Sequence, residues 1–296
     1  MNSTGRFYFS LSLSLILSLI SRAQVNTALF DYEKIAHPVF NVDSSFMAAK
    51  VLVKEGTYVT ADSFRISAYI TQPVELKNNA PLIIFNHWGE GNKNEFLAEA
   101  ITFSSSGFIC ILPDEPWLCP KSKINSFSRQ GDIMVRQAVI NTQVAIDLAA
   151  ANYVIDTNHI YVVGHSYGCA SGAILSAIEP RIDYFIFMTG VYSTTETATN
   201  SSQKDFVDWR TSRPEEFNKW IAKMKPYDPD LYLPHKKVPC LIQVAKQDEF
   251  ITKAENRKFI KITPKPKKVK WYDATHALNE EARADRKTWV MQMYDR

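Results

Sequence analysis

The chain has 296 residues, of which 46% are hydrophobic and 22% carry a formal charge. This balance excludes a disordered, collagen-like or disulfide-scaffold protein, and the length allows one large domain or two modest ones. The formal net charge is only +3, and the dense basic run at 261–270 contains no aromatic residue, so we expect no nucleic-acid partner. Glycine is scarce, with 10 residues in the chain, so the positions that it occupies are informative.

The first 23 residues have the pattern of a secretory signal peptide. An uncharged apolar stretch at 7–20 follows Arg6, and the small residues Ser21 and Ala23 suit cleavage before Gln24. This stretch is shorter than the roughly 20 residues that a membrane span needs, although an uncleaved anchor is the alternative. No later segment is apolar for long enough to cross a membrane. The sequence therefore predicts a secreted or periplasmic protein without a stable membrane span after signal removal, its mature part being 24–296.

The strand and helix patterns begin at about residue 49. Two β-type runs, 49–54 and 64–71, flank a predicted turn at Glu55-Gly56-Thr57. Further along, short continuous apolar runs predict buried strands, and apolar residues at helical spacing predict helices between them. The predicted strands are 82–85, 108–112, 160–163, 184–188, 240–245 and 269–272, and the predicted helices are 93–104, 132–151, 169–178, 253–261 and 278–294. This alternation predicts one α/β domain with a mostly parallel central sheet, helices on both faces and an antiparallel edge.

The four cysteines, at positions 110, 119, 169 and 240, form no C-x-x-C pair and lie near no histidine at zinc-ligand spacing. We therefore predict neither a metal site nor a cofactor. Export would permit disulfides, and Cys110 and Cys119 are close enough in sequence to bridge across a turn. Cys169 and Cys240 resemble small buried apolar residues instead.

The interval 190–239 interrupts the alternation of strands and helices. Two helix-like stretches, around 203–210 and 214–224, lie within it, together with five aromatic residues, namely Trp209, Phe217, Trp220, Tyr227 and Tyr232. Fifty residues between two buried strands are too many for an ordinary connection. We predict a helical cap insertion whose aromatic residues cover a substrate site, and a purely structural flap is the alternative.

One motif indicates the chemistry of the chain. Gly164-His165-Ser166-Tyr167-Gly168 follows the predicted strand 160–163 and precedes a predicted helix. A G-x-S-x-G pattern between a strand and a helix is the nucleophile elbow, in which a tight turn projects the serine above the sheet. Only small residues fit at the two ends of the motif, because those positions pass close to neighbouring backbone.

On these residues the chain resembles the α/β-hydrolase fold family, whose catalytic residues follow the order serine, acid, histidine. The resemblance covers about residues 49–294 and implies that Ser166 is the nucleophile, Asp248 the acid after strand 240–245, and His276 the base after the last strand. Glu249 and Asp273 are the alternative acids, and His87 and His165 are the alternative histidines.

The resemblance also implies an oxyanion hole made of two backbone N–H groups. One comes from Tyr167, the residue after the nucleophile, and the other from the loop after strand 82–85. The family often has His-Gly in that loop, whereas here Trp88 follows His87 and Gly89 comes next. The second donor is therefore either Trp88 or Gly89, and Trp88 is expected to form a wall of the acyl pocket.

The final stretch, 276–282 with Asp285, Arg286 and Trp289, looks like bacterial hydrolases of the dienelactone hydrolase and acetyl-esterase type. This resemblance implies a serine hydrolase that cleaves small-molecule carboxylic esters through an acyl-enzyme. A compact serine peptidase or amidase is the alternative, because peptidases of the prolyl-oligopeptidase type use the same triad order. Their propeller would not fit before residue 82. A non-catalytic binding protein on the same fold is a further alternative.

Overall fold

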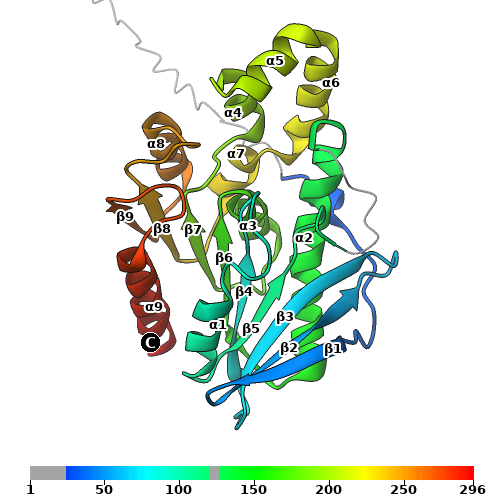
Figure 1. The fold of residues 1–296 in the computed structure, drawn as a ribbon, viewed down its shortest axis with the longest axis vertical. Helices are drawn as coiled ribbons and strands as arrows, with labels where there is room; N and C mark the ends of the chain where they lie inside the picture. The colour runs from blue at the N-terminus through cyan, green and yellow to red at the C-terminus, as the bar shows by residue number, and fades with distance from the viewer. Residues whose placement is uncertain (1–24, 120–126) are drawn as a thin grey trace, which may run out of the picture.

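The computed structural model describes residues 25–119 and 127–296, so the predicted signal peptide lies outside the described residues. A nine-stranded sheet in the order β1-β2-β3-β5-β4-β6-β7-β8-β9 forms the centre of this part (Figure 1). The strands are β1 (Asn41–Ala48), β2 (Val51–Val59), β3 (Arg65–Pro73), β4 (Ala80–Asn86), β5 (Ile109–Pro113), β6 (Ile155–His165), β7 (Tyr184–Met188), β8 (Cys240–Ala245) and β9 (Lys267–Tyr272). The pairs from β5 through β9 are parallel, and those joining β1, β2, β3 and β5 are antiparallel. The prediction of a mostly parallel sheet with an antiparallel edge is confirmed.

Helices cover both faces of the sheet. They are α1 (Leu97–Ser104), α2 (Phe127–Asn152), α3 (Tyr167–Ile178), α4 (Thr194–Asn200), α5 (Lys204–Ser212), α6 (Pro214–Met224), α7 (Pro229–Tyr232), α8 (Lys253–Ile262) and α9 (Glu280–Tyr294). Alternate residues of β4 enter opposite cores, as the two-residue period of a strand requires. Leu82 and Ile84 pack in the core with α2 and α3, whereas Ile83 and Phe85 pack in the core with α1 and α9. This double coverage explains why the central strands are apolar throughout.

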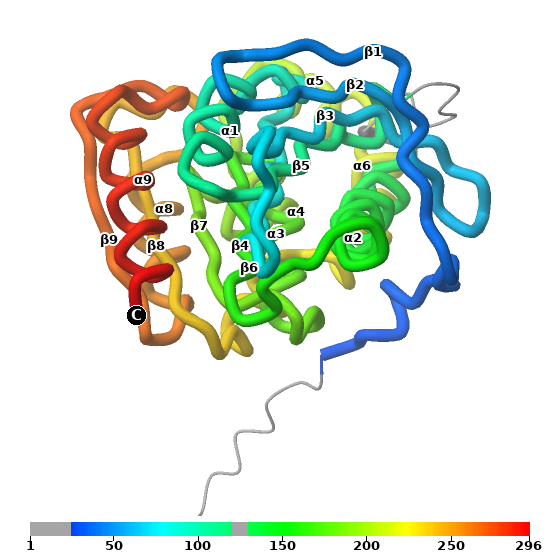
Figure 2. Tube along the Cα trace, turned by 90° about the horizontal axis from the view of Figure 1, so that it is seen from below, coloured from blue at the N-terminus to red at the C-terminus, as the bar shows by residue number. Residues whose placement is uncertain are grey.

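The antiparallel edge differs from the prediction in two ways. First, the sequence does not predict strand β1, which lies at the outer edge, far from β9 at the other edge (Figure 2). All residues of β1 except Ala48 are exposed, so its sequence carries no apolar alternation. The predicted turn at Glu55-Gly56-Thr57 is wrong, because these residues continue β2. A Cβ on Gly56 would lie 2.1 Å from the carbonyl oxygen of Asn41. Glycine is present here because two strands approach closely, not because the chain turns.

The interval between β7 and β8 forms helices α4 to α7, and α4, α5 and α6 lie together at one end of the molecule (Figure 1). Most of its aromatic residues do not cover a substrate site. The ring centroid of Trp209 lies 5.2 Å from that of Phe217 and 5.2 Å from that of Trp220, and all three side chains are buried. These residues therefore form a small core of the insertion, which continues into the core beside α2 and α3.

The four cysteines are all free and buried, so the bridge that the spacing of Cys110 and Cys119 would allow is not formed. Cys110 lies inside β5, where its thiol donates to the carbonyl oxygen of Ala100. Cys119 donates instead to the carbonyl oxygens of Asp114 and Glu115. In the described part of the chain, no helix is both long and apolar enough to cross a membrane. The same residues contain no group of three or more His, Cys, Asp or Glu side chains able to hold a metal ion.

A buried ion pair joins the two helices on one face of the sheet. The guanidinium of Arg286 in α9 donates from Nε and Nη2 to the two carboxylate oxygens of Glu99 in α1, at 2.7 and 2.6 Å. Its Nη1 donates to Oε1 of Gln243 in β8 at 2.5 Å. Such a two-pronged contact satisfies most of the polar atoms that burial would otherwise leave unpaired. Arg286 thus stabilises the packing of α9, the helix that follows the His276 loop.

Candidate active site

The sequence-predicted site residues meet at one edge of the sheet. A single cavity of about 500 Å³ is lined by residues from the segments that follow four strands. Trp88 and Gly89 follow β4, Ser166 follows β6, Phe250 follows β8 and His276 follows β9. In open α/β sheets the carboxyl ends of parallel strands are the usual place for a ligand. The fold therefore brings together residues that are up to 188 positions apart in sequence, from 88 to 276.

Ser166 occupies the tight turn that the motif predicts. It lies between β6 and α3 with φ +52° and ψ −105°, a backbone conformation that is costly for a residue with a side chain. A Cβ on Gly164 would lie 2.3 Å from the carbonyl oxygen of Gly168, and a Cβ on Gly168 would lie 2.2 Å from that of Asn86. Both motif glycines are therefore required by close backbone contacts.

The structure also brings His276 and Asp248 together. Nδ1 of His276 lies 3.0 Å from both carboxylate oxygens of Asp248, and the two side chains are 1% and 2% exposed. Oδ1 of Asp248 additionally accepts the backbone N–H groups of Phe250 and Ile251, at 2.9 and 2.8 Å. A carboxylate acceptor at Nδ1 places the ring proton there and leaves Nε2 free to act as a base.

The alternative acids lie elsewhere. Glu249 accepts the backbone N–H of His276 at 3.0 Å, so it holds the loop rather than the ring. Asp273 accepts a hydrogen bond from the side chain of Gln247. Sequence reasoning identified Glu249 as a neighbour of the acid but missed this contact, since nothing in the local sequence shows which atom of a residue 27 positions away is bound.

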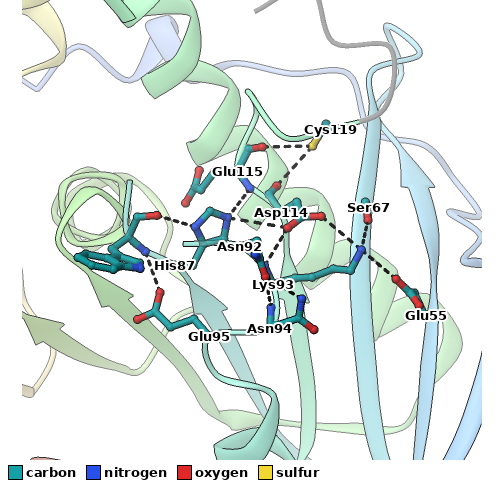
Figure 3. Close-up of polar contacts among 11 residues, drawn as sticks. Glu55, Ser67, His87, Asn92, Lys93, Asn94, Glu95, Asp114, Glu115 and Cys119 are labelled. Atoms are coloured by element: carbon teal, nitrogen blue, oxygen red, sulfur yellow. Dashed lines mark hydrogen bonds and ion pairs between the residues drawn. The ribbon is translucent and has the colours of Figure 1, made fainter. Parts of the chain in front are cut away.

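The alternative histidines, His87 and His165, have structural partners on both ring nitrogens. Nδ1 of His87 lies 2.7 Å from the carbonyl oxygen of Trp88, and Nε2 of His87 accepts the backbone N–H of Glu115 (Figure 3). Because Nε2 accepts this hydrogen bond, it carries no proton. The ring proton therefore lies on Nδ1, which donates to the carbonyl oxygen of Trp88, and the ring is neutral. Burial lowers the pKa of His87 below its ordinary value, which is consistent with this state.

The loop after β4 distinguishes the two candidate oxyanion donors. The backbone N–H of Trp88 donates to Oε2 of Glu95 at 3.0 Å, so it already has an acceptor. Among the described residues, no acceptor is found for the N–H of Gly89, which lines the cavity. Tyr167 directly follows Ser166 as the first residue of α3, the position from which the first oxyanion donor is expected. Of the two candidates for the second donor, Gly89 is therefore favoured over Trp88.

No hydrogen bond joins Ser166 to His276 in the described residues, although both line the cavity. Such contacts are often long without substrate and shorten when it binds. The rest of the lining is largely apolar and aromatic, with Trp88, Trp117 and Phe250 prominent. Among the insertion residues, Phe206 of α5 and Thr197 of α4 line the cavity, as well as Thr194, Ser201 and Gln203. The insertion therefore covers the site through these residues and not through its larger aromatics.

A family model described as the prolyl oligopeptidase family matches residues 95–280. The chain belongs to this family. The matched region contains Ser166, Asp248 and His276, and it begins after the loop that carries Trp88 and Gly89. No curated protein matches this prolyl oligopeptidase family member in sequence.

Solved structures show the same fold at low sequence identity. An acetyl xylan esterase from Thermoanaerobacterium sp. JW/SL YS485 matches with a TM-score of 0.77 and 17% identity over 91% of this chain and 92% of that one. The acetyl xylan esterase from Paenibacillus sp. R4 matches with a TM-score of 0.74 and 16% identity, over 90% and 91%. An S-formylglutathione hydrolase from Agrobacterium tumefaciens matches with a TM-score of 0.65 and 13% identity, over 85% and 99%. The family and these fold matches confirm the resemblance to α/β-hydrolase serine hydrolases.

Proposed function

We propose that the chain hydrolyses small-molecule carboxylic esters with Ser166, Asp248 and His276 as a catalytic triad. The observation that carries the proposal is the cavity in which Ser166 and His276 meet, with Asp248 fixing the far nitrogen of the imidazole. The fold matches to two acetyl xylan esterases add support for ester chemistry.

The proposed reaction has two steps. In the first, Oγ of Ser166 attacks the ester carbonyl carbon while Nε2 of His276 takes the hydroxyl proton. The tetrahedral intermediate expels the alcohol, which receives that proton from His276. In the second, water attacks the acyl-enzyme in the same way and releases the acid. The N–H groups of Tyr167 and Gly89 stabilise the negative oxygen in both steps.

A fluorophosphonate probe tests this proposal directly. The protein should be labelled, and Ser166→Ala should lose both labelling and the hydrolysis of short acyl esters. Gly172→Ala is the control. It lies in α3, which begins directly after Ser166, and a Cβ there meets only the Phe187 ring, at 3.4 Å. Unchanged labelling of Ser166→Ala would overturn the assignment of the nucleophile.

Membership of the prolyl oligopeptidase family favours a second candidate, a serine peptidase or amidase using the same residues. A panel of short acyl esters, aminoacyl amides and prolyl amides separates the two. Esterase function predicts that kcat/KM for the best ester exceeds that for every amide by more than the intrinsic difference in reactivity. Faster turnover of a prolyl amide would instead assign the peptidase.

We also propose that the protein is exported, secreted or periplasmic, on the strength of Arg6, the apolar stretch 7–20 and the small residues before Gln24. Expression of the full chain in a bacterial host followed by N-terminal sequencing tests this. A mature protein that begins at Gln24 and is found outside the cytoplasm supports export, and an intact N-terminus in the cytoplasm contradicts it.

A further inference from the structure

Glu95 lies in the turn before α1, just after the loop that follows β4 and carries Trp88 and Gly89, here called the oxyanion loop. Its carboxylate contacts both this loop and the nucleophile elbow. Oε2 accepts the backbone N–H of Trp88 at 3.0 Å, and Oε1 lies 2.5 Å from Nδ1 of His165. The side chains of Glu95 and His165 are 18% and 2% exposed. A Cβ on Gly91 would lie 2.3 Å from the Trp88 ring and 3.0 Å from Oε2 of Glu95. A glycine at position 91 therefore makes room for this arrangement.

His165 continues the contact to the histidine loop. Its Nε2 lies 3.0 Å from the carbonyl oxygen of His276. A carbonyl oxygen only accepts, so Nε2 carries a proton, and the short contact between Nδ1 and Glu95 requires a second proton between those two atoms. Wherever that proton resides, the Glu95–His165 pair is neutral as a unit and has a hydrogen-bonding partner at each end.

Ring packing reinforces the same connection. The His165 ring is parallel to the Trp88 ring, with centroids 5.5 Å apart and an angle of 5°, and its centroid lies 5.1 Å from that of His276. The Trp88 and His276 rings are themselves 5.6 Å apart. One residue of the nucleophile elbow thus contacts both the oxyanion loop and the loop that carries the base.

We propose that Glu95 and His165 are a positioning pair that sets the oxyanion loop at a fixed distance from His276. The pair holds the N–H of Trp88 and thereby directs the next N–H, that of Gly89, towards the cavity. It also holds the His276 loop through a backbone carbonyl, while Asp248 orients the ring. Neither residue touches the substrate. This inference rests on the proposed function, because it assigns a role to the geometry of that site.

The test compares kcat and KM for a short acyl ester across four variants. Glu95→Ala removes both carboxylate contacts, and His165→Phe keeps a ring beside Trp88 but removes both nitrogens. Each should lower kcat by about 100-fold, the scale expected for misplaced catalytic groups, with KM within about threefold of wild type. The double variant should be no slower than the slower single variant, because both residues act through one connection.

Glu95→Gln is the conservative variant. Its amide oxygen can accept the N–H of Trp88, and its NH₂ can donate to Nδ1 of His165, so kcat should recover to within about tenfold of wild type, since both hydrogen bonds are kept. Glu75→Ala, an exposed position in the turn after β3, is the matched control and should leave kcat unchanged.

Three results would overturn the positioning role. These are wild-type kcat in His165→Phe, losses that multiply in the double variant, or a higher kcat in Glu95→Ala, which would mean that Glu95 competes for a catalytic N–H. If Glu95→Ala shows no cooperative unfolding transition, the contrast between Glu95→Gln and His165→Phe decides instead. Ser166→Ala is measured in parallel. Activity retained there refutes the proposed function, whereas its loss together with an active Glu95→Ala refutes only the positioning pair.

Discussion

Both carboxylate oxygens of Asp248 lie 3.0 Å from Nδ1 of His276, and water is almost excluded from the contact. Glu249, the next residue, instead accepts the backbone N–H of His276. Two adjacent carboxylates therefore bind the same histidine through different atoms, which makes their contributions separable by mutation.

We expect Asp248→Asn to lower kcat by about 10⁴-fold, because the amide can present a donor to Nδ1 and favour the tautomer in which Nε2 is protonated. Glu249→Gln retains an oxygen for the His276 N–H, so its kcat should stay within about tenfold of wild type, as a lost charge on one hydrogen bond costs little. Steady-state kinetics on one ester measures both. Equal losses in the two variants would contradict the assignment of Asp248 as the residue that orients the ring.

Gly168→Ala should destabilise the protein by about 3 kcal/mol or more, because its Cβ would overlap the backbone of Asn86, which cannot rotate away. Gly172→Ala, one turn further along α3, should be neutral or stabilising by up to about 1 kcal/mol, because a helix favours alanine over glycine. Urea unfolding monitored by circular dichroism gives both values. A Gly168→Ala variant as stable as wild type would show that the elbow can relax.

Arg286→Ala should destabilise the protein by about 3–5 kcal/mol, since it leaves the buried Glu99 carboxylate without its partner. Arg283→Ala in the same helix is the control. Arg283 pairs with Glu280 at the surface, so its loss should cost less than about 1 kcal/mol. Thermal unfolding of the two variants side by side gives the comparison, and similar melting temperatures would refute the importance of the buried pair.

Glu115 should make stability depend on pH. Burial, and then the nearby Asp114 and Glu95, raise the pKa of Glu115 to about 8 (Figure 3). Between these two pKa values the folded protein holds a proton that the unfolded chain, with a pKa of 4.5, has released. The contribution of Glu115 to the free energy of unfolding is therefore complete below about pH 4.5 and is lost as the pH rises to about 8. One unit of pKa corresponds to about 1.4 kcal/mol, so the loss amounts to a few kcal/mol.

Glu115→Gln should therefore unfold at higher urea concentration than wild type at pH 8, with a smaller difference at pH 5. The exposed Glu75→Gln is the control and should show no such trend. A constant difference between wild type and Glu115→Gln across this range would mean that Glu115 is already ionised in the folded protein.

The sequence predicted the central strands and the elbow well because both leave local signals. Strands buried on both faces are continuously apolar, so the predicted 184–188 and 240–245 coincide with β7 and β8. The exposed strand β1 leaves no such signal. Gly56 gave a misleading one, since a glycine placed by strand contact looks like a glycine placed by a turn.

The candidate site residues were assigned in a different way. Ser166 follows from the G-x-S-x-G motif, whereas Asp248 and His276 were implied by the resemblance to the α/β-hydrolase fold family, and all three lie just after strands. The role of Glu95 could not be predicted, because its partners are 7 and 70 residues away and its own surroundings look like the start of an ordinary helix. The choice between Trp88 and Gly89 likewise depended on where Glu95 lies.

One short helix of the insertion between β7 and β8 serves both the cavity and the core. In α5, Phe206 lines the cavity while Trp209, three positions later, packs with Phe217 and Trp220. Phe206 also packs against the core that contains these three residues. A change at position 206 therefore alters the cavity wall and the edge of the core together, so the shape of the cavity and the stability of the insertion are coupled through one side chain.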